Sequence, residues 1–136
     1  MQYSEKKIIS IIAPEEGMGG LSFFESGKDL PFEIKRIYYI YGVDSGRTRG
    51  MHMHKSLRQL MFCPYGEIEL TFDNGHERET VRLDSPGKAL LIEPGLWREI
   101  RWIKADSVLC VAASEYYNEE DLSLIHISEP TRQEAI

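Results

Sequence analysis

The sequence predicts an all-β domain, either a sandwich or a closed barrel. Short runs rich in β-branched and aromatic residues recur along the chain, and glycine, proline, asparagine or aspartate interrupts them. No segment shows the longer period of an amphipathic helix. Many short strands at this spacing are typical of antiparallel sandwiches and barrels. With 136 residues, the chain is long enough for one hydrophobic core and too short for two.

The individual strands follow from side-chain alternation and turn chemistry. Residues 67–72 alternate polar and apolar side chains, so the apolar ones are predicted to share one face. The Asp73-Asn74-Gly75 sequence that follows predicts a tight hairpin, because asparagine and glycine tolerate the positive φ of such turns. By the same criteria, strands are predicted at residues 34–41, 67–72, 77–83, 89–92, 97–103 and 108–113.

Composition and charge exclude several classes of partner. The formal net charge is −6, which disfavours nucleic-acid binding because that binding depends on neutralising phosphates. No apolar stretch has the length needed to cross a bilayer, and residues 1–7 have no apolar run behind them that would serve as a secretory signal. We therefore expect a cytoplasmic protein with no nucleic-acid or membrane partner. Cys63 and Cys110 are expected to be small buried hydrophobes.

His52 and His54 are the main candidates for chemistry. In a strand, residues two apart point to the same side, with their β-carbons about 7 Å apart. Two imidazoles can hold part of a metal site, or they can exchange protons with a substrate near neutral pH. A metal site needs further ligands, and Gln59 and the Trp97-Arg98 pair stand where these would be sought. Proton transfer without a metal is therefore the favoured interpretation.

Tyr38, Tyr39 and Tyr41 lie on the predicted strand at 34–41. Their hydroxyl groups are candidate hydrogen-bond donors to a carbonyl or enolate oxygen. The alternative for each tyrosine is ordinary packing in the barrel.

Several short motifs carry a family resemblance: RIYYIY at 36–41, RGMHMHK at 49–55, Gln59, LDSP at 83–86, PGLWRE at 94–99 and ASEYY at 113–117. They occur in the order seen in bacterial sugar 3,4-ketoisomerases, and the chain resembles that family from about residue 31 to residue 121. These enzymes are cupins, with a double-stranded β-helix (jelly-roll) barrel, and they act on dTDP-4-keto-6-deoxyglucose. The resemblance thus implies a cupin fold and a dTDP-linked 4-keto-6-deoxyhexose as substrate.

The resemblance also implies a mechanism and an assembly. The keto group moves from C4 to C3 through an enediol, with neither a metal nor a redox cofactor, and His52 and His54 act as base and acid. The family forms homodimers that exchange N-terminal strands, and its products feed amino-sugar synthesis for surface polysaccharides. The substrate-binding residues expected on this basis are Tyr38, Tyr39, Arg49, Lys55, Gln59 and Arg98. For Lys55 and Arg98 the alternative is a solvated barrel rim.

Two other functions remain open at this point. One is a 3,5-epimerase-like activity on a dTDP-4-keto sugar, which also begins with proton abstraction beside a ketone. The other is a non-catalytic, sugar-nucleotide-binding cupin, favoured if an arginine that the family carries near its start is essential, because Met18 stands in its place. The configuration of the product at C4 is left open as well.

The C-terminal segment differs from the rest of the chain. Residues 122–132 resemble the conceptual translation of a sequencing-library adapter. We therefore expect residues 1–121 to form the cupin domain and residues 122–136 to be a non-native tail. His126 is excluded from any site for this reason.

Overall fold

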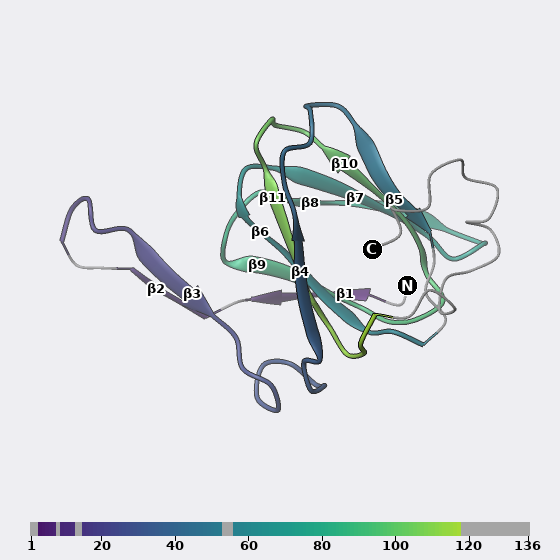
Figure 1. Cartoon of the computed structure of the whole chain (residues 1–136), viewed down its shortest axis with the longest axis horizontal. Coiled ribbons are helices and arrows are strands. Elements are labelled where there is room, and N and C mark those ends of the chain that lie inside the picture. Colours follow the sequence, from purple (N-terminus) through teal and green to yellow (C-terminus); the bar gives the residue numbers. More distant parts are fainter. Residues whose placement is uncertain (1–2, 8, 13–14, 53–55, 118–136) are drawn as a thin grey trace.

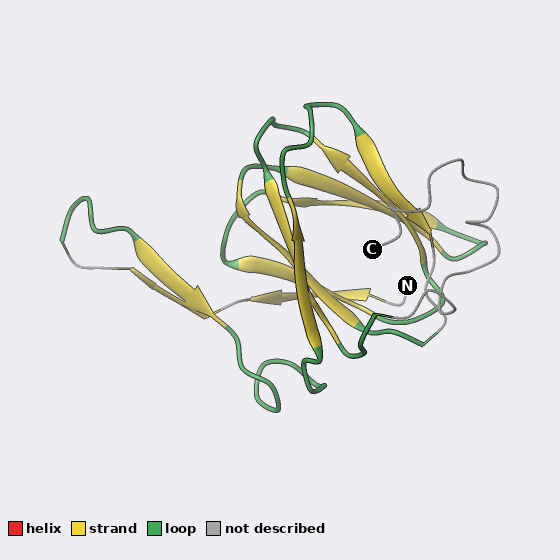
Figure 2. Ribbon diagram, viewed as in Figure 1, coloured by secondary structure: helices red, strands yellow, loops and turns green. Residues whose placement is uncertain are grey.

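The computed structural model describes residues 3–7, 9–12, 15–52 and 56–117, with side chains for all of these except 5–7, 9–12, 51 and 52. The described residues form strands, turns and loops without a helix (Figure 2). Within that part of the chain, accordingly, no helix could cross a membrane. The predicted all-β class is confirmed.

Three antiparallel sheets account for the strands of the described residues. The largest has the order β1 (Tyr3–Lys7), β9 (Lys88–Ile92), β6 (Gln59–Tyr65), β11 (Val108–Ala113) and β4 (Arg36–Ile40). The second has the order β5 (Thr48–His52), β10 (Trp97–Trp102), β7 (Ile68–Asp73) and β8 (Arg78–Leu83). The third pairs only β2 (Ile9–Ile12) with β3 (Gly20–Phe23).

The two larger sheets face each other and form a jelly-roll barrel (Figure 1). Neighbours within each sheet are often distant in sequence, as with β1 beside β9 and β5 beside β10. The β2–β3 hairpin projects away from the barrel (Figure 1). An isolated hairpin is only marginally stable in water, so packing against another surface would stabilise it.

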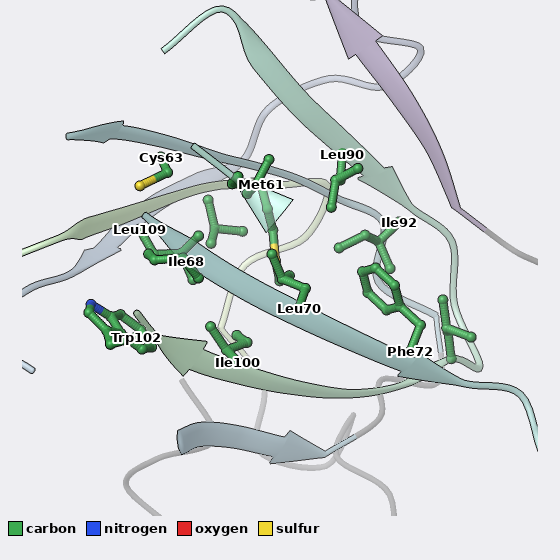
Figure 3. Packing of buried hydrophobic residues seen from close by; sticks show 13 residues of the cluster. Met61, Cys63, Ile68, Leu70, Phe72, Leu90, Ile92, Ile100, Trp102 and Leu109 are labelled. Atoms are coloured by element: carbon green, nitrogen blue, oxygen red, sulfur yellow. The ribbon is translucent and has the colours of Figure 1, made fainter. Parts of the chain in front are cut away.

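The core fills the space between the two sheets (Figure 3). The alternation predicted for residues 67–72 is confirmed, because Ile68, Leu70 and Phe72 are fully buried while their neighbours on β7 are partly exposed. Cys63 is buried as expected, whereas Cys110 is only half-buried. The buried members of this cluster are Met61, Cys63, Ile68, Leu70, Phe72, Leu83, Leu90, Ile92, Leu96, Ile100, Trp102, Leu109 and Val111.

Six strands lie where the pattern predicts them, with ends displaced by one or two residues. The pattern did not identify β1, β2, β3 and β6, and it gave no bounds for β5, the strand on which His52 was expected. In β6, for example, Leu60 is buried beside Gln59 and Met61, because a second apolar cluster covers its outer face. A strand buried on both faces shows no alternation, which is why its sequence did not reveal it.

Candidate active site

One end of the barrel interior is polar, and strand register explains why. Arg98 on β10 pairs with both His52 on β5 and Phe72 on β7, and Phe72 pairs in turn with Glu79 on β8. In the other sheet, Gln59 on β6 pairs with Ala113 on β11, and Ala113 pairs with Arg36 on β4. Register therefore places His52 and Arg98 in one row of the second sheet, and Gln59 and Arg36 in one row of the largest sheet. We call this region the polar end.

Gln59 links Arg98 to Tyr38 across the interior. The Arg98 Nη1 group donates a hydrogen bond to Gln59 Oε1. The other half of the same amide, Nε2, donates to the Tyr38 hydroxyl at 2.9 Å. Three of the predicted site residues, from three different strands, are thus joined in one hydrogen-bonded chain.

Arg98 is completely buried, so the solvated-rim alternative for this residue is wrong. A buried guanidinium must have hydrogen-bond partners, because transferring an unpaired charge from water is very costly. In addition to Gln59, Arg98 donates to the Leu96 carbonyl through Nε at 3.3 Å and Nη2 at 3.1 Å. These bonds hold the side chain against its own strand and explain how it remains inside the barrel.

Tyr38 lies in a positively charged environment. Burial raises the pKa of its hydroxyl above the usual value, and the nearby guanidinium groups of Arg98, Arg36 and Arg49 oppose that rise. Burial has the larger effect, so the group is a neutral phenol at physiological pH. It can therefore donate a hydrogen bond and stabilise negative charge that develops on a nearby oxygen.

A cavity of about 240 Å³ lies beside this strand, lined by Tyr38, Tyr39, Ile40, Tyr41 and Arg49. Side chains of β4 alternate between its two faces, so Tyr38 is half-buried, whereas Tyr39 is 61% exposed. Tyr41, directly after the strand, is 69% exposed. The rings of Tyr39 and Tyr41 lie 5.9 Å apart. The structure thus joins Tyr38 to Gln59 and Arg98, and leaves Tyr39 on the outer face.

Arg36 is a member of the site that the sequence analysis did not select. Its guanidinium carbon lies 5.2 Å from the centre of the Tyr38 ring and 5.6 Å from that of Tyr117. The Nε atom of Arg36 is buried and has no hydrogen-bond partner among the described residues. The alternation of β4 would have found this residue, because Arg36, Tyr38 and Ile40 share a face.

Glu79 and Tyr3 lie beside the site and support it structurally, and the sequence analysis did not select them either. The Tyr3 hydroxyl donates to Glu79 Oε1 at 2.7 Å, and the Tyr3 ring stacks on Phe72 with centroids 4.5 Å apart. The signal for Glu79 was its spacing of two and four residues from Val81 and Leu83, which places all three on the inner face of β8. Nothing in the sequence near Tyr3 indicated that β1 pairs with β9.

The remaining predicted residues lie partly outside the described part of the chain. The backbone of His52 ends β5, but its side chain is not among those described, and His54 and Lys55 fall outside the described residues. Within the described part, no group of three histidine, cysteine, aspartate or glutamate side chains is placed to hold a metal ion. Because the side chains of His52 and His54 are outside the described part, the absence of a metal stays a prediction. His76 is exposed at the β7–β8 hairpin, as its position in the sequence suggested.

The comparison that decides the family covers most of the chain: the family described as "FdtA: WxcM-like, C-terminal" matches residues 4–124. The chain belongs to this family. A curated relative from Aneurinibacillus thermoaerophilus, TDP-4-oxo-6-deoxy-α-D-glucose-3,4-oxoisomerase, is 37% identical over 117 residues, which are 86% of this chain and 84% of that protein.

Solved structures of ketoisomerases have the same fold. QdtA, a sugar 3,4-ketoisomerase from Thermoanaerobacterium thermosaccharolyticum solved in complex with TDP, superposes with a TM-score of 0.84 at 37% identity, covering 90% of this chain and 87% of that one. A 3,4-ketoisomerase from Helicobacter canadensis also gives a TM-score of 0.84, at 34% identity over 90% of each chain. The cupin-type barrel expected from the sequence is confirmed.

Proposed function

We propose that this FdtA-family chain is an isomerase that moves the keto group of a dTDP-4-keto-6-deoxyhexose from C4 to C3. The observation that carries the proposal is the 37% identity, over 86% of the chain, to a TDP-4-oxo-6-deoxy-glucose 3,4-oxoisomerase. Further support comes from QdtA, 36% identical in that comparison, which was solved as a histidine-to-asparagine mutant in complex with TDP-4-keto-6-deoxyglucose.

In this proposal, His52 and His54 transfer the protons. Residues directly opposite each other in an antiparallel pair share a face of the sheet. The pairing of His52 with Arg98, whose side chain lies inside the barrel, therefore supports an inward-facing position for His52. His54 follows two residues later, so continued strand geometry would bring it to the same side.

The proposed reaction conserves every atom of the sugar. One histidine removes the proton from C3 while the C4 oxygen gains a proton, which gives an enediol. The C3 hydroxyl then loses its proton as C4 gains one, which leaves a ketone at C3 and a hydroxyl at C4. An imidazole suits both steps, since it accepts and returns protons near neutral pH. No metal or redox cofactor is required for this sequence of steps.

The charges at the polar end support an anionic substrate. Arg36, Arg49 and Arg98 all act on the Tyr38 hydroxyl, and no described carboxylate contributes to its pKa shift. Such a field favours a pyrophosphate group and the negative oxygen of an enediol-forming step. We assign substrate contacts to Tyr38, Tyr39, Arg49 and Lys55, with Gln59 and Arg98 joined to them through Tyr38.

We also propose a homodimer, organised around two features of the fold. β4 is an edge strand of the larger sheet, and it exposes Ile37 and Tyr39, with Tyr41 exposed just after its end. The β2–β3 hairpin projects from the barrel, with Leu21 exposed at 61% (Figure 1). Exposed apolar edges of this kind are unusual unless another chain covers them. Exchange of the hairpins between two subunits would cover both features.

We also propose the extent of the catalytic domain and the location of the enzyme in the cell. We assign residues 1–121 to the catalytic domain and residues 122–136 to a tail without function; the tail lies outside the described residues. We place the enzyme in the cytoplasm, where its product would enter amino-sugar synthesis for surface polysaccharides.

Incubation with the 4-keto sugar in deuterated water tests the proposal. Isomerisation places deuterium on C4 of a 3-keto product, and turnover survives exhaustive treatment with a chelator. Label at C3 or C5 with the ketone still at C4 would instead indicate an epimerase. Binding of dTDP without any exchange above background would indicate a non-catalytic binding protein.

A further inference from the structure

We infer that Arg98 and Gln59 are positioning residues, which fix the direction of hydrogen bonding so that the Tyr38 hydroxyl donates into the 240 Å³ cavity. This inference deepens the proposed function and rests on it. It assigns two buried residues a role that acts through Tyr38.

The direction of the chain follows from the chemistry of its first member. A guanidinium has donors and no acceptor, so the Gln59 atom facing Arg98 must be the amide oxygen. The amide is rigid and planar, so its NH₂ group necessarily faces the other partner, which is the Tyr38 hydroxyl at 2.9 Å. Tyr38 is thereby an acceptor in this bond, and its own proton must point elsewhere.

The Tyr38 proton has no acceptor among the described residues. Tyr38 lines the cavity together with Arg49, and we infer that its proton is directed there. Because burial of the hydroxyl keeps it in its neutral form, the proton is retained at physiological pH. The bound sugar would therefore meet a fixed donor, next to positive charge, at the oxygen that becomes negative during enediol formation.

A purely structural role predicts something different. If the chain only held the two sheets together, replacing Gln59 would change stability and leave catalysis per folded molecule intact. The direction of the hydrogen bond can be reversed with almost no change in shape, by Gln59→Glu. A carboxylate still accepts from Arg98, but it also accepts from Tyr38, which turns the Tyr38 proton away from the cavity.

The test is a double-mutant cycle of Gln59→Glu and Tyr38→Phe, with kcat and KM measured for each variant. Loss of a single donor to a developing oxyanion typically lowers kcat by about 10²- to 10³-fold, and we expect each single variant to fall in this range with KM little changed. Without the Tyr38 hydroxyl, the direction of its hydrogen bond with residue 59 no longer affects catalysis. We therefore expect the double variant to be no slower than Tyr38→Phe alone. Multiplicative losses would overturn the inference, as would full activity in Gln59→Glu.

A matched control and a second variant keep the result interpretable. Asn74→Asp makes the same amide-to-carboxylate change at an exposed hairpin, where the Asn74 side-chain oxygen only accepts from the backbone N–H groups of His76 and Glu77, and it should leave kcat unchanged. Should Gln59→Glu fail to fold, Gln59→Met takes its place in the cycle. Gln59→Met removes the hydrogen bond that orients the Tyr38 hydroxyl but does not reverse its direction. We therefore expect a smaller loss of kcat, again with no further loss when Tyr38→Phe is added.

A spectroscopic readout separates this inference from the proposed function. The ring carbon that bears the hydroxyl, labelled with ¹³C in tyrosine and assigned with Tyr38→Phe, reports the ionisation of Tyr38. Gln59→Glu removes a donor and adds negative charge, so it should raise the pKa of Tyr38 whether or not the protein isomerises the sugar. An unshifted titration would contradict the inference alone, whereas a raised pKa in a protein without isomerase activity would contradict only the proposed function.

Discussion

The two ends of the barrel interior differ in character although the same strands build both. On β10 the inward-facing residues are Arg98, Ile100 and Trp102, and all three are buried. Arg98 belongs to the polar end, whereas Trp102 lies among Ile68, Leu109 and the rest of the apolar cluster (Figure 3). We call this second region the apolar end. Side chains in a strand alternate between its two faces with a period of two. One strand can therefore supply a polar side chain to the candidate site and, four residues later, an apolar side chain to the core.

The two ends also satisfy their buried polar atoms in different ways. At the apolar end, the Trp102 Nε1 group donates to the Ser107 carbonyl at 2.9 Å, so this buried donor has a hydrogen-bond partner within the chain. At the polar end, Tyr38 lines a cavity, and the buried Arg36 Nε has no hydrogen-bond partner among the described residues. An end whose buried polar atoms are hydrogen-bonded within the protein contributes stability, whereas an end with unpaired buried donors is suited to binding a ligand. Substitutions at the two ends should therefore have separable consequences.

The largest expected effect is on turnover at the polar end. His52→Asn and His54→Asn retain polarity and approximate size but remove a group that titrates near neutral pH. Loss of a general acid or base typically lowers the rate by about 10²- to 10⁴-fold. We expect kcat to fall by this factor in steady-state assays, while dTDP binding measured by calorimetry changes little. Near-normal turnover in both variants would remove the proposed mechanism.

The next effect is on stability at the apolar end. Ile68 is fully buried, so Ile68→Ala should lower the free energy of unfolding by about 2–5 kcal/mol and Ile68→Val by about 0.5–1.5 kcal/mol. Tyr65→Ala is the control at the same end, because Tyr65 is 67% exposed, and its effect should stay within about 0.5 kcal/mol. Urea unfolding measures all three. Equal losses for Ile68→Ala and Tyr65→Ala would show that burial does not set stability here.

A smaller effect concerns charge at the apolar end. Burial raises the pKa of the Cys63 thiol to about 11, above an ordinary value near 9, although backbone hydrogen bonds with Tyr65 and Val108 oppose the rise. The folded state therefore holds this proton more tightly than the unfolded state, and its contribution to stability, complete below pH 9, declines as the pH rises from 9 to 11. Alkylation at pH 8, followed by mass spectrometry, should modify Cys63 about 100-fold more slowly than an exposed thiol. Labelling of Cys63 at the rate of a free thiol would contradict its burial.

The smallest effect is expected where the N-terminal strand meets the second sheet. Tyr3→Phe keeps the stacking on Phe72 and removes the hydrogen bond to Glu79. A bond of this kind contributes about 1 kcal/mol, and more when its partner is charged. We expect a loss of roughly 1–2 kcal/mol in thermal or urea unfolding, with kcat preserved. The same loss in a Glu79→Ala background, where no side-chain acceptor remains, would show that the bond is not responsible.

The apolar end was easier to predict from sequence than the polar end. Alternation and turn residues gave six strands and the inward set of β7, because each strand carries its own period. The family motifs selected Tyr38, Gln59 and Arg98, but not the chain of hydrogen bonds among them. That chain depends on strands distant in sequence being adjacent in the barrel, and nothing local specifies that β6 lies between β9 and β11. Arg98 was difficult for a further reason, because an arginine in a strand is ordinarily expected at the surface.

The most direct test of the division between the two ends compares His52→Asn with Ile68→Ala side by side. For each variant, the melting temperature and the kcat per folded molecule at low temperature are measured against the parent protein. We predict that His52→Asn keeps its melting temperature and loses at least 99% of its turnover, in line with a loss of about 10²-fold or more, whereas Ile68→Ala melts earlier and keeps its turnover. A His52→Asn variant that loses activity only in proportion to lost stability, or one that remains fully active, would contradict the account.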